Sequence, residues 1–185
     1  MKIYYITGNK RKIDRARLIC ARTGIEIEQI ELETPEIQGN NSEEIAAYSA
    51  QFAGEKLKKP LIKLDVSFHI NALNGFPGPF VKYINQWLKP KDVLKMMEGI
   101  KNRSCYWTDA LAFYQAGKPV KVFSSQEQGE ISIKARGKNG WGMDKIFIPE
   151  GQNKTKAELS DSERINICNR GHWDQFIGYI EKIIS

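Results

Sequence analysis

The chain has 185 residues, 41% of them hydrophobic, which suffices for one compact core, and we expect a single domain over residues 1–185. Its 28 basic and 22 acidic side chains give a formal net charge of +6, which favours phosphate-rich partners, although a solvated basic surface has the same composition. No stretch approaches about 20 apolar residues, so we expect no membrane span.

The cysteines and the N-terminus indicate a cytoplasmic protein. Cys20, Cys105 and Cys168 are far apart and show no C-x-x-C spacing, which is typical of a reducing compartment. The apolar run at the N-terminus is short and breaks at Gly8-Asn9, which is typical of a first strand and not of a secretory signal.

The first predicted elements are a strand, a helix and a second strand. Residues 3–6 are rich in β-formers, and apolar residues follow at helical spacing from position 13 to 20 before Gly24 ends the helix. Residues 25–32 predict the second strand. Its apolar alternation shifts at Gln29, which favours a β-bulge there.

A longer helix and a buried strand follow. Asn41 precedes Glu44 by three residues, which resembles a helix cap, and Pro60 ends that helix. Residues 61–66 predict a buried strand, and residues 74–79 contain too many helix and strand breakers for a regular element. Two short helices are expected over residues 83–88 and 91–97.

The last part of the chain predicts a hairpin and a helix. Residues 106–114 and 120–126 are rich in β-formers and flank a credible turn at residues 116–119. Apolar residues recur at helical spacing at Trp173, Phe176, Ile177, Ile180 and Ile184. Together the elements predict an α/β domain with an elongated, mixed β-sheet flanked by helices.

The turn after the first strand is a candidate phosphate site. Residues 7–12, Thr-Gly-Asn-Lys-Arg-Lys, lie where a strand meets a helix, so free backbone N–H groups and the helix dipole favour an anion there. Lys10 and Lys12 would neutralise a triphosphate. A Gly-Asn turn with solvated lysines is also a common way to begin a helix, so the segment alone does not establish a ligand.

Further motifs occur in an order that resembles the inosine/xanthosine triphosphate pyrophosphatase family. The T-G-N-K-x-K opening, the E-I-Q of residues 36–38 and the A-L-N-G-F-P-G-P of residues 72–79 are similar to its signatures. Residues 140–149, G-W-G-M-D-K-I-F-I-P, and residues 155–159, T-K-A-E-L, resemble two more. The resemblance covers nearly the whole chain.

This resemblance implies a reaction and a fold. The family cleaves a nucleoside triphosphate between the α- and β-phosphates, uses Mg²⁺, and folds into two lobes with a central nucleotide-binding cleft. Lys12, Glu36 and Asp65 match its catalytic residues, and Glu36 and Asp65 would hold the metal, since Mg²⁺ prefers oxygen ligands. Without the ordered motifs, Glu36 would be taken for a surface residue and Asp65 for a turn cap.

The resemblance also implies substrate contacts. Thr7, Asn9, Lys10, Lys12, Lys82 and Arg164 match positions near the phosphates. Trp141 matches an aromatic residue that stacks on the base, and Asp144 and Arg170 match residues that hydrogen-bond to it. Asn169, which directly precedes Arg170, occupies the position where the family has histidine.

Several positions depart from the family pattern. Leu64 replaces an acidic residue before Asp65, which puts metal affinity or water activation in doubt. The segment Cys168-Asn169-Arg170 replaces Ser-His-Arg, so we expect the base preference to differ. His172 either replaces the missing imidazole or packs on the final helix, and packing is the expected role. Residues 143–145, Met-Asp-Lys, replace an aromatic residue, Asp and Pro.

Two other functional readings stay open. One is a nucleotide-binding relative in which catalysis is lost or altered. The other is a nucleic-acid-binding domain, which only the charge and the aromatic residues favour and which no motif supports, so we do not expect a nucleic-acid partner. The family also implies a homodimer.

Overall fold

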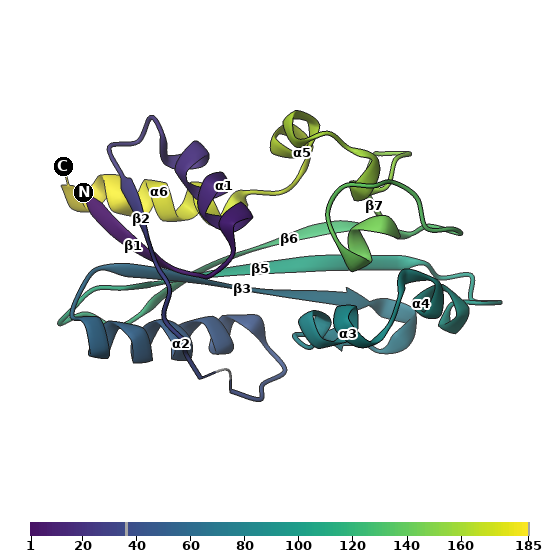
Figure 1. Cartoon of the computed structure of the whole chain (residues 1–185), viewed down its shortest axis with the longest axis horizontal. Helices are drawn as coiled ribbons and strands as arrows, with labels where there is room; N and C mark the ends of the chain where they lie inside the picture. The colour runs from purple at the N-terminus through teal and green to yellow at the C-terminus, as the bar shows by residue number, and fades with distance from the viewer. Residues whose placement is uncertain (36, 185) are drawn as a thin grey trace. The chain divides into compact units, whose positions relative to one another are not determined.

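The structure is a computed structural model that describes residues 1–35 and 37–184, and its centre is a seven-stranded sheet with the order β2-β1-β3-β5-β6-β7 (Figure 1). The strands are β1 (Lys2–Ile6), β2 (Glu26–Ile30), β3 (Leu61–Ile70), β4 (Pro77–Gly78), β5 (Ser104–Tyr114), β6 (Lys121–Ile131) and β7 (Phe147–Pro149). β1 is parallel to β2 and β3, whereas β4 and β7 are antiparallel to β3 and β6. The predicted mixed sheet is confirmed.

Helices connect and cover these strands. The α-helices are α1 (Lys10–Cys20), α2 (Ser42–Leu57), α3 (Val81–Trp87), α4 (Pro90–Met96), α5 (Asp161–Ile167) and α6 (Gly171–Ile184). Three short 3₁₀ helices are η1 (Asn71–Leu73), η2 (Gly142–Lys145) and η3 (Lys156–Glu158). Among the described residues, no helix is both long and apolar enough to cross a bilayer.

The chain forms two compact units, and β3, β5 and β6 contribute residues to both. Unit 1 comprises Met1–Asp65, Asp109–Ser125 and Arg170–Ser185. Unit 2 comprises Val66–Thr108 and Gln126–Asn169.

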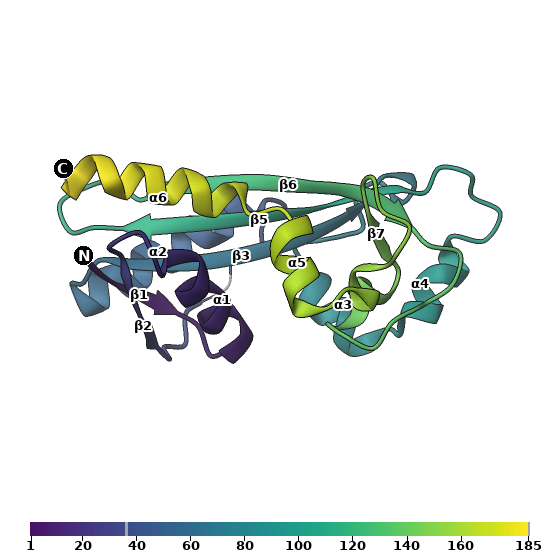
Figure 2. The same cartoon turned by 90° about the horizontal axis from the view of Figure 1, so that it is seen from above.

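Unit 1 has helices on both faces of its part of the sheet (Figure 1). On one face α1 and α6 bury their apolar stripes, with Ile13 of α1 and Trp173 and Phe176 of α6 in a single cluster. In Figure 2 α6, coloured yellow, runs alongside β5 and β6. The other face is covered by α2, where a side chain at Gly54 would overlap the ring of Tyr114, so glycine permits close packing of this helix.

Unit 2 is built around three aromatic rings. Phe68 of β3 lies 4.5 Å from Trp107 of β5 and 5.9 Å from Phe147 of β7, measured between ring centroids. Residues of α3 and α4 complete this core, which also contains Met143 of η2. The turn that carries Met143 is thereby attached to the core of unit 2.

Most predicted elements are confirmed, and two details are wrong. The register of β1 with β2 runs unbroken through Tyr5 and Gln29, so there is no bulge at Gln29. Its amide instead donates to the carbonyl of Thr7 at 2.8 Å, which explains a polar residue in an otherwise apolar pattern. Within the predicted breaker-rich loop, Pro77 and Gly78 form the two-residue β4, because they pair with the extended end of β3.

Candidate active site

The turn from β1 to α1 in unit 1 is closed by its own side chains. Asn9 caps α1, and its Oδ1 accepts from the backbone N–H groups of Arg11 and Lys12 at 3.0 and 3.4 Å. The Thr7 hydroxyl accepts from the N–H of Asn9 at 3.1 Å. Two of the helix-start N–H groups expected to be free are therefore occupied, since asparagine is a strong N-cap residue.

The same turn still exposes backbone donors. Among the described residues, none accepts a hydrogen bond from the N–H of Gly8 or of Lys10. Gly8 is exposed, and a Cβ placed on it would meet no atom within 4 Å. The turn thus offers two N–H groups, a helix N-terminus and the nearby Lys10 ammonium to an approaching anion.

Lys12 reaches the strand that carries Asp65. Its Nζ donates to the carbonyl oxygen of Leu64 at 3.3 Å, and the Lys12 side chain is half-buried. Because Asp65 directly follows Leu64, two of the three predicted catalytic residues lie in neighbouring positions of unit 1. The third, Glu36, lies outside the described residues.

Side chains of β3 and α2 hold residues 34 and 35 in place. The Lys63 ammonium donates to the Thr34 hydroxyl at 2.9 Å, and the Ser49 hydroxyl of α2 donates to the carbonyl of Pro35 at 3.2 Å. Lys63 and Asp65 are two residues apart on β3, so their side chains lie on the same face of the strand. Lys63 was not among the residues predicted from the sequence, although a lysine inside an apolar strand was a visible signal.

The described residues offer little to a metal on their own. Within residues 1–35 and 37–184, no group of three or more His, Cys, Asp or Glu side chains is arranged to hold an ion. Asp65 supplies hard oxygen ligands, and the carbonyl of the preceding residue, Leu64, accepts from the Lys12 ammonium. This donor set fits a Mg²⁺ ion that is held mainly by substrate phosphates and water.

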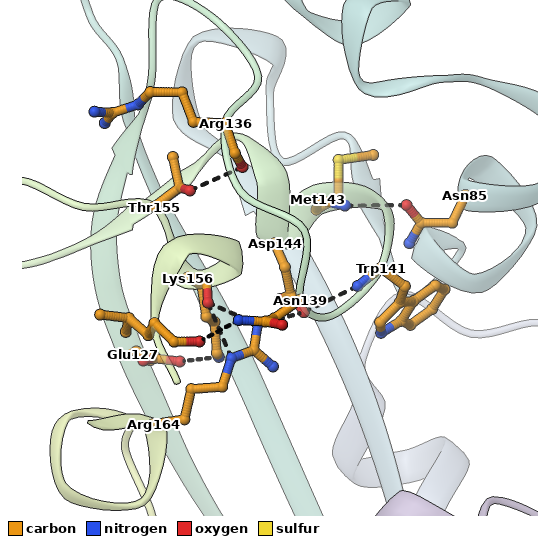
Figure 3. Close-up of polar contacts among 11 residues, drawn as sticks. Asn85, Glu127, Arg136, Asn139, Trp141, Met143, Asp144, Thr155, Lys156 and Arg164 are labelled. Atoms are coloured by element: carbon orange, nitrogen blue, oxygen red, sulfur yellow. Dashed lines mark hydrogen bonds and ion pairs between the residues drawn. The ribbon is translucent and has the colours of Figure 1, made fainter. Parts of the chain in front are cut away.

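Unit 2 contains a second predicted group, centred on the buried carboxylate of Asp144 (Figure 3). Its Oδ2 accepts from the backbone N–H of Trp141 at 3.2 Å and from Nη2 of Arg164 at 3.1 Å. Trp141 is about half exposed, at 49%, and Figure 3 shows its indole directed away from the carboxylate. An exposed aromatic face beside an oriented carboxylate suits a base that is stacked and hydrogen-bonded.

Arg164 connects Asp144 to the loop before α5. Its Nε and Nη2 both donate to the carbonyl oxygen of Lys156, at 2.9 and 2.7 Å. Arg164 was predicted near the phosphates, and the structure places it against a predicted base-pocket residue. A phosphate contact for Arg164 stays a prediction.

A capping box fixes the loop that carries Lys156. The N–H of Thr155 donates to Oε2 of Glu158 at 2.7 Å, and this hydrogen bond is the main reason that the pKa of Glu158 is lowered. The Thr155 hydroxyl in turn donates to the carbonyl of Arg136 at 3.0 Å. Hydrogen bonds therefore hold the chain at Thr155 and at Glu158, on either side of Lys156.

The remaining predicted contacts are spread over both units. In unit 2, Asn169 Nδ2 donates to the carbonyl of Gln126 at 2.7 Å, and Lys82 is exposed, with its ammonium 5.5 Å from the centre of the Tyr83 ring. In unit 1, Arg170 is exposed, and its Nε lies 3.4 Å from Oδ1 of Asp174.

His172 packs inside unit 1 and does not replace the missing imidazole. Its side chain is buried, and Nδ1 lies 2.8 Å from the Ser125 hydroxyl, which also accepts from the backbone N–H of His172 at 3.1 Å. The start of α6 is thereby attached to β6. This is the packing role expected for His172.

Comparisons with known proteins show the family of the chain. Residues 3–173 match the model of the Ham1 family. The chain is 40% identical to the dITP/XTP pyrophosphatase of Methanopyrus kandleri, over 92% of this chain and 90% of that protein. It is 37% identical to the dITP/XTP pyrophosphatase of Saccharolobus solfataricus, over 98% and 94%.

Solved structures show the same fold. The Ham1 protein of Staphylococcus aureus superimposes with a TM-score of 0.86 over 98% of this chain and 99% of that one, at 23% identity. A HAM1 protein from Coxiella burnetii gives a TM-score of 0.82 over 100% and 98%, at 24% identity.

Proposed function

We propose, from the premise that this chain belongs to the Ham1 family, that it is a nucleoside-triphosphate pyrophosphatase acting on non-standard purine nucleotides such as dITP and XTP. The observation that carries this proposal is 40% identity over most of the chain to a relative named for that activity. The arrangement of the predicted residues supports it. Unit 1 offers cations and N–H groups suited to phosphates, and unit 2 offers a carboxylate and an aromatic ring suited to a purine.

We further propose that the bond cleaved lies between the α- and β-phosphates, so that the products are a monophosphate and pyrophosphate. Lys10, Lys12 and the exposed N–H groups at Gly8 and Lys10 would bind the phosphates and stabilise the charge that develops on their oxygens. Asp65, beside Lys12, would orient the attacking water or accept its proton.

Mg²⁺ is the proposed cofactor, and Asp65 and Glu36 are its proposed protein ligands. When bound, such an ion neutralises phosphate charge and polarises the phosphoryl group. Leu64 supplies no carboxylate, so this chain has fewer acidic groups than the family pattern. We therefore expect the metal to bind weakly in the absence of nucleotide.

The test is a pyrophosphate-release assay over normal and deaminated ribo- and deoxyribonucleoside triphosphates, with and without Mg²⁺. Pyrophosphate and a monophosphate should appear as first products, fastest with ITP, dITP or XTP. Diphosphate with orthophosphate would refute the cleavage position. Binding without turnover for every nucleotide would instead favour a relative in which catalysis is lost.

Asp65→Asn is the matched variant for this assay. It keeps the shape of the side chain and removes its charge, so turnover should fall by about 10²-fold or more. The exposed Glu150→Gln in unit 2 removes one carboxylate elsewhere and should leave turnover unchanged. Full activity of Asp65→Asn would remove Asp65 from the mechanism.

We also propose that the chain forms a homodimer, which rests on the family resemblance alone. Light scattering at assay concentrations measures the mass directly. A particle with the mass of one 21.1 kDa chain would refute this proposal.

A further inference from the structure

Unit 2 contains a buried ion pair that the proposed reaction does not use. Lys156 Nζ lies 2.6 Å from Oε2 of Glu127, and the two side chains are only 13% and 6% exposed. By contrast, both side chains of the Lys2–Glu28 pair in unit 1 are more than 40% exposed. Burying two charges costs several kcal/mol per ion, so a buried pair is poorly explained by stability alone.

The surroundings of this pair are aromatic. The Lys156 ammonium lies 5.5 Å from the ring centre of Trp107 and 5.6 Å from that of Phe147. Among the described residues, nothing hydrogen-bonds to the buried Oε1 of Glu127 or to the buried Nε1 of Trp107. The Lys156 side chain is thus anchored in the core of unit 2 by one carboxylate and two rings.

The backbone of Lys156 connects this anchor to the predicted base pocket (Figure 3). Its carbonyl oxygen accepts two hydrogen bonds from Arg164, and Arg164 donates in turn to Asp144. Gly140 leaves the space for this contact, since a Cβ there would overlap Asp144 Oδ2 and crowd Arg164 Nη2. The side chain and the carbonyl of one residue therefore link Glu127 to Asp144.

We propose that Glu127 and Lys156 are positioning residues for purine selection, which rests on the proposed function. The ion pair fixes Lys156, the Lys156 carbonyl orients the guanidinium of Arg164, and Arg164 orients the carboxylate of Asp144. Among the described residues, none accepts from Nη1 of Arg164, so that edge stays available to a nucleotide oxygen. A carboxylate held in this way accepts from the N–H of a keto purine, which adenine lacks at the same ring nitrogen.

Removing the charge of Glu127 would disturb the contacts that connect it, through Lys156 and Arg164, to Asp144. In Glu127→Gln the ammonium would stay buried without an opposite charge, which is unfavourable, so the Lys156 side chain would move toward water. Its peptide group would turn with it, and Arg164 would lose the double hydrogen bond. Asp144 would then be less well oriented, which lowers discrimination between bases more than it lowers affinity for the triphosphate.

The first experiment measures kcat/KM for ITP and for ATP in the wild type and in Glu127→Gln. The ratio of ITP to ATP should fall by about 10-fold, which corresponds to about 1.4 kcal/mol of lost discrimination. The control is Val93→Ala, which removes bulk from the core of unit 2 without touching Lys156 or Arg164. Its ratio should stay at the wild-type value even though its thermal stability falls.

A double-mutant cycle separates positioning from general destabilisation. If Glu127 acts through Arg164, then adding Glu127→Gln to Arg164→Met should change the ratio no further. A further fall of the ITP-to-ATP ratio by about 10-fold in the double variant, relative to Arg164→Met alone, would overturn the inference. A wild-type ratio in Glu127→Gln alone would also overturn it. Rescue of the ratio by the conservative Glu127→Asp would support it.

Calorimetric titration of ITP and ATP gives the same ratio for binding and distinguishes the two possible failures. A wild type that binds both nucleotides without hydrolysing them would contradict the proposed function, while the binding ratio would still test Glu127. A wild type that binds neither would overturn both proposals.

Discussion

The amide nitrogen of Asn169 forms a hydrogen bond within the protein. Nδ2 donates to the carbonyl of Gln126 at 2.7 Å, which commits one of the two N–H groups of the amide. An amide carries both donor and acceptor groups, so it suits a keto oxygen or an amino group, whereas a histidine N–H donates to the keto oxygen alone. We therefore expect this chain to separate keto from amino purines less sharply than a homologue with histidine here.

Asn169→His tests this expectation. Regaining one hydrogen bond to a keto oxygen should raise the kcat/KM ratio of ITP over ATP by about 10-fold. Asn169→Ala is the control, because it removes the amide without supplying a ring donor and should not raise the ratio. An unchanged ratio in an active Asn169→His enzyme means that residue 169 does not read the base.

Gly140 provides a second residue-scale prediction. Its φ of +70° already disfavours alanine, and the new Cβ would overlap Asp144 Oδ2. Gly140→Ala should lower kcat/KM for ITP by about 10-fold or more, because Asp144 and Arg164 are pushed apart. Gly151 has a similar φ of +73° and open space around it, so Gly151→Ala carries the backbone strain alone. If kcat/KM for ITP falls equally in both variants, backbone strain and not the overlap with Asp144 causes the effect.

At the scale of elements, most local signals predicted the structure correctly, with the alternation at Gln29 as an exception, whereas elements defined by nonlocal pairing were missed. Asn41 was predicted as a helix cap from its neighbours, and its Oδ1 accepts from the N–H groups of Glu43 and Glu44. The apolar period of α6 likewise depends on adjacent residues. β7 is three residues long and shows no period, so only its pairing with β6 defines it.

The N-terminus of α5 carries a prediction about pH. The pKa of Glu163 is lowered to about 2, first by the N–H of Ser160, then by the Ser160 hydroxyl and by Lys154. A lowered pKa means that the charged form stabilises the folded state above the ordinary value of 4.5, and that this stabilisation is lost as the pH falls toward 2.

The melting temperature of Glu163→Gln should accordingly lie below that of the wild type at about pH 7, and the gap should narrow as the pH falls below about 4.5. Thermal denaturation of both proteins from about pH 7 to pH 3 measures the gap. Lys154→Met removes only the weakest of the three named contacts and should keep most of the narrowing. A gap that is constant with pH would exclude the charge of Glu163 as the cause.

At the scale of the whole molecule, the motif order gave the fold and the two predicted groups of residues, but not how side chains hold them. Lys12 beside Leu64 and Asp65 was expected from the motifs. Glu127 and Lys156 are 29 residues apart, and no local pattern relates them. Their pairing follows from the packing of η3 against β7, which pairs with β6, and this arrangement exists only when unit 2 is folded.

The positive charge of the whole chain leads to the last prediction, which concerns the class of partner. A net charge of +6 attracts both a nucleoside triphosphate and a nucleic acid, but the two respond differently to salt. A triphosphate held by oriented N–H groups and a base pocket keeps part of its affinity when long-range attraction is screened. An oligonucleotide held by scattered surface lysines loses most of its affinity as counterions compete.

Raising the salt from about 0.05 to 0.3 M should therefore raise KM for ITP only severalfold and leave kcat nearly constant. A single-stranded oligonucleotide should inhibit pyrophosphate release weakly at the lower salt and not at the higher, because nothing beyond charge retains it. Reversal of any inhibition by salt distinguishes charge attraction from a built binding surface. Inhibition that persists at the higher salt would indicate an oriented nucleic-acid site. It would support a nucleic-acid-binding domain, which the motif order does not predict.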